Sequence, residues 1–73
     1  MNNQTRRIYL LIFNNSALIV SSNLSDFYRQ LKNLDIGYSN SESTLRKEFR
    51  ILESFTFNQG SRVYWFQKIE NND

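Results

Sequence analysis

The apolar residues change their spacing twice along the chain, and this change constrains the fold more than any other feature. Residues 6–13 and 17–22 are rich in β-branched and aromatic side chains, residues 24–34 repeat apolar side chains every three or four positions, and alternation returns after residue 53. Alternation indicates strands, whereas a spacing of three to four indicates an amphipathic helix. The predicted order is therefore strand, strand, helix, helix, strand, strand.

The first predicted strand, residues 6–13, is apolar on both of its faces. Ile8, Leu10 and Ile12 alternate with a second set on the opposite face. This pattern is typical of a strand that is covered on both sides. Asn14 and Asn15 follow the strand, and because asparagine tolerates a positive φ angle, a tight hairpin to a strand at 17–22 is predicted.

The first predicted helix has a single apolar stripe. Asn23 or Ser22 can cap its start, and Gly37 is expected to end it. The residues of the stripe are Leu24, Phe27, Tyr28, Leu31 and Leu34.

A second helix is predicted over residues 40–52. Ser39 and Glu42 have the spacing of a capping box. Phe49 and Leu52 fall within roughly 40° of Leu45 on a helix of 3.6 residues per turn, so these three are expected to face inward.

A second hairpin, of residues 54–57 with 62–69, completes the chain around the turn NQGS. The predicted fold is α+β, an antiparallel sheet of two hairpins with two helices on one face, and its element order is winged-helix-like. How the hairpins pair with each other is not predicted. Residues 6–69 form the single domain expected, and residues 1–5 and 70–73 are expected to be frayed.

Composition excludes several classes of function. The 73 residues contain no cysteine and no histidine, which removes thiolate metal sites, the commonest metal ligand and the commonest general base. No nucleophile has an identifiable base beside it and no glycine-rich phosphate loop occurs, so neither an enzyme nor a cofactor is expected. No signal peptide and no apolar run of about 18 residues is found, so a cytoplasmic protein without a membrane span is expected.

The second helix carries its positive charge on one side. Ser43, Arg46, Lys47 and Arg50 fall in an arc from roughly 100° to 200° away from Leu45, with no acidic residue among them. Such a ridge can contact phosphates or enter a DNA groove. It can also be an ordinary solvated face or a contact for an acidic protein.

The hairpin that follows would serve as the wing of a winged helix-turn-helix. Arg62 would lie at the wing tip, where it could reach a phosphate or the minor groove. Arg6 and Arg7 lie at the end of a strand. They would join the same surface only if the sheet topology places that strand end beside it.

The stretches SSNLSDFYRQL, SESTLRKEF and VYWF resemble the small helix-turn-helix modules of phages and mobile elements, of the type found beside homing nucleases. The resemblance covers roughly residues 20–69. It implies DNA as the partner. The turn after Leu34 is longer than the three to four residues of a standard helix-turn-helix. The residues that would face DNA are Ser41, Ser43, Thr44, Arg46, Lys47 and Arg50.

The aromatic strand offers an alternative function. Tyr64, Trp65 and Phe66 are candidates for an interface, because helices can cover only one face of a sheet. An open aromatic face could stack single-stranded bases, or it could pack against a copy of itself to form a homodimer. The sequence thus favours a non-enzymatic DNA-binding module. The alternative is a protein-interaction or inhibitory module that works through this face.

Overall fold

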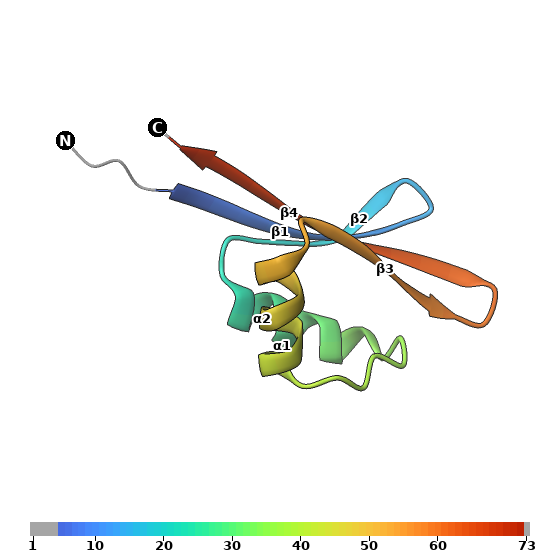
Figure 1. Cartoon of the computed structure of the whole chain (residues 1–73). Helices are drawn as coiled ribbons and strands as arrows, with labels where there is room; N and C mark the ends of the chain where they lie inside the picture. Colours follow the sequence, from blue (N-terminus) through green and yellow to red (C-terminus); the bar gives the residue numbers. More distant parts are fainter. Residues whose placement is uncertain (1–4, 73) are drawn as a thin grey trace.

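A computed structural model, which describes residues 5–72, shows one four-stranded antiparallel sheet and two helices. The strand order is β2-β1-β4-β3, so the first and last strands of the chain form the centre of the sheet (Figure 1). The predicted α+β class and ββααββ order are confirmed. Among the described residues, neither helix has the length and apolar character needed to cross a membrane. The elements are β1 (Thr5–Phe13), β2 (Ser16–Ser21), α1 (Leu24–Leu34), α2 (Glu42–Ile51), β3 (Ser54–Gln59) and β4 (Arg62–Asn72).

The β1–β2 hairpin turns at two asparagines, as predicted. Asn14 and Asn15 have φ angles of 55° and 65°, and Phe13 pairs with Ser16 across the turn. Two consecutive residues with positive φ are typical of a type I′ turn, whose twist matches that of the flanking strands. The two asparagines therefore set the register next to the turn, and the pairing shifts by one residue at an irregularity between Leu11 and Ile12.

The pairing of β1 with β4 joins the two hairpins. It runs from Thr5 opposite Asn72 to Ile12 opposite Trp65. Residues 5 and 70–72, which were expected to be frayed, thus belong to the central ladder, while residues 1–4 and 73 lie outside the described part of the chain.

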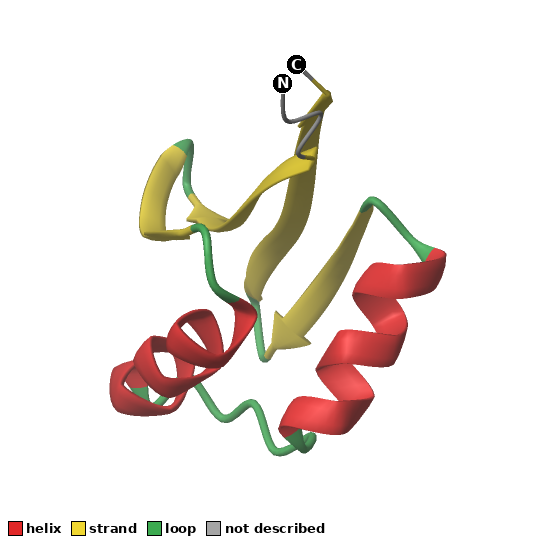
Figure 2. Cartoon of the chain, turned by 90° about the vertical axis from the view of Figure 1, so that its left-hand side faces the viewer, coloured by secondary structure: helices red, strands yellow, loops and turns green. Residues whose placement is uncertain are grey.

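Both helices cover the same face of the sheet (Figure 2). On that face β1 presents Tyr9 and Leu11, which are buried. On the opposite face Ile8, Leu10 and Ile12 are only partly buried, and no described element packs over them. The prediction that β1 is covered on both sides is therefore wrong, and one apolar face of the sheet stays open.

The first helix begins at its predicted cap and ends at Leu34, but its stop residue is Asp35 rather than the predicted Gly37. The Asn23 side chain accepts a hydrogen bond of 3.0 Å from the backbone N–H of Asp26. The C-cap is Asp35, in the left-handed conformation with a φ angle of 55°, and Gly37, with a φ angle of 85°, lies two residues beyond it. Leu34, which was assigned to the apolar stripe, is 40% exposed because the helix has reached its last turn.

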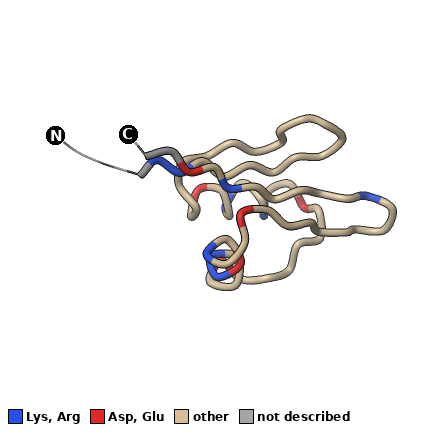
Figure 3. Tube along the Cα trace, turned by 45° about the horizontal axis from the view of Figure 1, so that its top comes forward, with Lys and Arg blue, Asp and Glu red and all other residues tan. Residues whose placement is uncertain are grey.

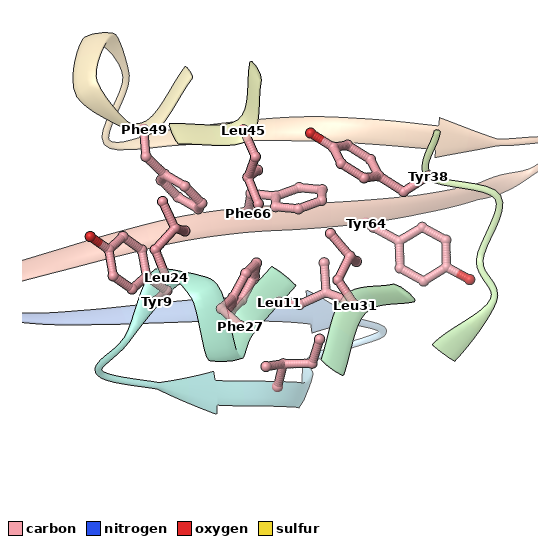
Figure 4. Packing of buried hydrophobic residues seen from close by; sticks show 11 residues of the cluster. Tyr9, Leu11, Leu24, Phe27, Leu31, Tyr38, Leu45, Phe49, Tyr64 and Phe66 are labelled. Atoms are coloured by element: carbon pink, nitrogen blue, oxygen red, sulfur yellow. The ribbon is translucent and has the colours of Figure 1, made fainter. Parts of the chain in front are cut away.

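The core is built around Phe66, which has no exposed surface (Figure 4). Its ring stacks on Phe55 from β3, with the centroids 4.9 Å apart, and lies 5.3 Å from the ring of Tyr38. Phe27 of α1 and Phe49 of α2 complete the cluster at 6.1 and 6.2 Å. Both helices are therefore anchored on one side chain of β4.

Candidate nucleic-acid interface

Helix α2 turns its apolar side to the sheet and its basic side to solvent. Leu45 and Phe49 are buried, as predicted. Leu52 is 45% exposed, because the helix ends at Ile51 and Leu52 is its extended C-cap. The inward anchor is therefore two residues rather than three. The basic ridge of α2 is exposed along its whole length and consists of Ser43, Arg46, Lys47 and Arg50.

The hydroxyl groups at the start of α2 form hydrogen bonds with one another and with a backbone N–H of the first helical turn. Ser41, not Ser39, is the N-cap, and its hydroxyl accepts a hydrogen bond of 3.2 Å from the backbone N–H of Thr44. The Ser41 hydroxyl also lies 3.0 Å from that of Ser43 and 3.1 Å from that of Thr44. All three residues are exposed, but the Ser41 hydroxyl caps the helix and the hydroxyls of Ser43 and Thr44 are hydrogen-bonded to it.

The cations of the basic ridge differ in their partners. Arg46 donates to the carboxylate of Glu42 at 2.8 Å, and the same oxygen accepts a hydrogen bond of 2.8 Å from Ser25. The side chains of Lys47 and Arg50 form no hydrogen bond or ion pair with any residue in the described part of the chain. An exposed ion pair contributes little to stability, so Arg46 can exchange Glu42 for another anion at small cost.

A cleft of about 350 Å³ lies between α2 and the central strands. We call it the cationic cleft, because four of its lining residues are basic and one is acidic. Figure 3 shows basic positions on α2 and on the β1–β4 ladder toward the termini, at the same end of the molecule, with acidic positions among them. The lining residues are Arg7, Tyr9, Leu24, Arg46, Phe49, Arg50, Lys68 and Glu70.

Two of these basic residues come from the sheet. Arg7 of β1 is directly opposite Glu70 of β4, and its Nε donates to Glu70 Oε2 at 2.8 Å. This hydrogen bond and the charge of Glu70 raise the pKa of Arg7 above its ordinary value. The topology therefore brings Arg7 to α2, whereas Arg6 alternates to the other face of β1.

Lys68 fixes the end of α2 to the sheet. Its Nζ donates to the backbone carbonyl of Phe49, and its backbone N–H donates to the carbonyl of Glu53 at 2.8 Å. A cation at a helix C-terminus is favourable because the last carbonyls carry partial negative charge. Lys68 was not among the predicted site residues, although alternation along β4 places it on the same face as Phe66.

Arg62 lies far from the basic ridge. It is the first residue of β4 and pairs with Gln59 across the turn of the β3–β4 hairpin. That turn is roughly 20 Å along β3 from the end of α2, at 3.3 Å per residue, and it extends beyond α2 (Figure 1). The predicted wing tip and the basic helix therefore do not form one continuous surface.

The three aromatic interface candidates on β4 are divided between its faces. Tyr64 and Phe66 are buried in the core under the helices. Their assignment as interface residues is therefore wrong, and both are core residues. Trp65 is 51% exposed on the open face, where it pairs with Ile12 of β1. Alternation on the pleat makes this division unavoidable. Only Trp65 of the three is available to a partner.

Two carboxylates in hydrogen-bonded positions should make stability depend on pH. Hydrogen bonds from Ser25 and then Arg46 lower the pKa of Glu42, and hydrogen bonds from Ser21, Gln30 and then Arg29 lower the pKa of Asp26. The folded state then binds fewer protons than the unfolded chain. The contribution of these two carboxylates to stability is therefore present above the ordinary carboxyl pKa and is lost as the pH falls below about 4.

Urea denaturation over an acidic pH series checks this expectation. The double variant Asp26→Asn, Glu42→Gln should show a smaller loss of unfolding free energy between neutral and acidic pH than the parent chain. An equal loss in both proteins would assign the acid sensitivity to other carboxylates.

No family model matches the chain, and no curated protein or solved structure is significantly similar to it. The resemblance to phage and mobile-element helix-turn-helix modules therefore remains a prediction from the sequence. The candidate interface is assigned from the positions and charges of its own residues.

Proposed function

We propose that this protein is a non-enzymatic module that binds duplex DNA through the basic ridge of α2 and the adjoining cationic cleft. The observation that carries the proposal is the pair Lys47 and Arg50, which are exposed and without a side-chain partner among the described residues. Arg46 lies beside them, and Arg7 and Lys68 line the neighbouring cleft. Arg62 is not part of this surface.

The position of α2 suits contact with a duplex. Its basic ridge faces away from the sheet, and no described element covers it (Figure 2). A helix of ten residues is about 15 Å long, and the major groove, about 12 Å wide, admits one helix. Arginine and lysine would bind phosphates and so fix the orientation of the helix. The resemblance of the sequence further suggests a regulatory module of a phage or mobile element that acts in the cytoplasm of its host.

A salt series tests the proposal directly. Fluorescence anisotropy should detect binding of the protein to a labelled random-sequence duplex at low salt, with weaker binding to a single strand. If three to five phosphates are contacted, the slope of log K against log salt should be about −2.7 to −4.5. No binding to the duplex at the lowest salt would contradict the proposal.

A second candidate function uses the open sheet face. The open face carries no charged residue between Ile8, at one end of the β1–β4 ladder, and Val63, at the other. Trp65, Val63 and Ile69 are exposed on this face. A second copy of the chain presents the same uncharged apolar surface, so the face suits a homodimer. Light scattering should then give a dimer that persists at high salt and becomes a monomer in Trp65→Glu. A monomer at high protein concentration would exclude this function.

A further inference from the structure

Cations outnumber carboxylates in the cationic cleft. Arg7, Arg46, Arg50 and Lys68 line it, and Glu70 is the only acidic residue among the described side chains that do so. Its floor is formed by the buried rings of Tyr9 and Phe49. The cleft volume, about 350 Å³, is far larger than the ~10–15 Å³ of accessible volume that one water molecule needs. The cleft therefore combines excess positive charge with room for a small anion.

The Glu70 carboxylate forms ion pairs with two of the four cations at once. One of its carboxylate oxygens lies 2.8 Å from Nε of Arg7, and the other lies 3.8 Å from Nζ of Lys68. The side chain is only partly buried, at 35% exposure. Lys68 is also fixed by the carbonyl of Phe49, so its charge stays at the cleft whether or not Glu70 is beside it.

A phosphate group makes the same kind of contact as a carboxylate. Its oxygens accept charge-assisted hydrogen bonds from guanidinium and ammonium groups, and arginine can bind it in a bidentate manner. Arg50 has no side-chain partner among residues 5–72 and can add a contact that Glu70 does not use. A phosphate in the cleft would therefore gain at least one cation relative to the internal carboxylate.

We propose that the cationic cleft binds one phosphate group of the nucleic-acid backbone, and that the Glu70 carboxylate occupies this phosphate's place in the free protein. This inference rests on the proposed function and deepens it. Binding in the cleft would fix α2 at one position along the strand, while Glu70 weakens binding by competing with the phosphate for Arg7 and Lys68.

The test compares two variants with the same change in net charge. Glu70→Gln removes the internal competitor. Asp35→Asn removes a carboxylate at the C-terminal end of α1, away from the cleft. Asparagine tolerates the left-handed conformation that residue 35 adopts. Glu70→Gln should bind the labelled duplex roughly fivefold more tightly than the parent chain, the effect of one exposed ion pair at the upper end of its range. At about 0.1 M salt, Asp35→Asn should change the affinity by less than about twofold, because charges more than a Debye length of about 10 Å away are screened.

A second pair removes one cation from different places. Arg50→Gln should lower the affinity for the duplex at least about fivefold, and Arg62→Gln, at the distant hairpin turn, by less than about twofold. Inorganic phosphate gives an independent readout. In ¹H–¹⁵N spectra it should shift the amide resonances of Tyr9, Phe49 and Lys68 more strongly in Glu70→Gln than in the parent chain.

The outcomes separate this inference from the proposed function. An equal gain of duplex affinity in Glu70→Gln and Asp35→Asn, or amides in the cleft that phosphate leaves unmoved in Glu70→Gln, would overturn the inference and leave DNA binding intact. Absence of duplex binding in the parent chain and in all four variants would overturn the proposed function and the inference with it.

Discussion

Replacing Phe66 with alanine should leave most of the chain unfolded at physiological temperature. Phe66 is fully buried, and its ring contacts rings from β3, both helices and the loop that carries Tyr38. Truncation of a buried phenylalanine costs about 3–5 kcal/mol through lost contacts and the cavity left behind. A single core in a chain below about 80 residues rarely supplies more than about 3–5 kcal/mol, so little stability would remain.

Circular dichroism and urea denaturation measure this effect. The matched control is Ile51→Ala, because the Ile51 side chain is 79% exposed and its truncation should change the free energy of unfolding by no more than about 0.5 kcal/mol. A cooperative transition in Phe66→Ala close to that of the parent chain would show that the core does not depend on this ring.

Removing the three cations of the basic ridge should abolish most of the affinity for duplex DNA. The triple variant Arg46→Ala, Lys47→Ala, Arg50→Ala loses up to three phosphate contacts, so its slope of log K against log salt should become shallower by about 2–3. At low salt we expect an affinity about 100-fold lower, because the affinity of a protein with several phosphate contacts falls by orders of magnitude when these contacts are screened or removed. The fold should survive, because alanine favours a helix and an exposed ion pair such as Arg46–Glu42 contributes little to stability.

A second triple variant controls for net charge. Arg29→Ala, Lys32→Ala, Arg62→Ala also removes three cations, from α1 and the hairpin turn, and should retain most of the affinity. Equal losses in the two triple variants would mean that only the total charge matters, which is not compatible with a defined binding surface on α2. Melting temperatures measured beside the affinities ensure that folded proteins are compared.

The elements could be predicted because their signals are local. The spacing of Leu24, Phe27 and Leu31 indicates a helix whatever else the chain does, and Asn14 and Asn15 mark a turn by their own conformational preference. The errors lie where elements end. Leu52 fits the apolar period of α2, but the helix stops one residue earlier, so the side chain of Leu52 remains exposed.

The cationic cleft could not be predicted because it depends on contacts between distant residues. Arg7 meets Glu70 only because β1 pairs with β4, and no feature of either strand alone specifies that pairing. The same pairing decides which face of β4 the helices cover, and hence that Tyr64 is buried whereas Trp65 is exposed. The basic ridge, in contrast, follows from the helical period of one segment, and for that reason the sequence already indicated it.

The central position of β1 and β4 has a consequence for how the protein is made. β1 is synthesised first among the strands and β4 last, yet they are neighbours along almost their whole length. On the ribosome β1 can pair only with β2, because its other edge has no partner until β4 has emerged from the exit tunnel. Formation of the complete sheet must therefore await the end of β4, and its long-range pairing makes it slower to form than a helical bundle of the same size.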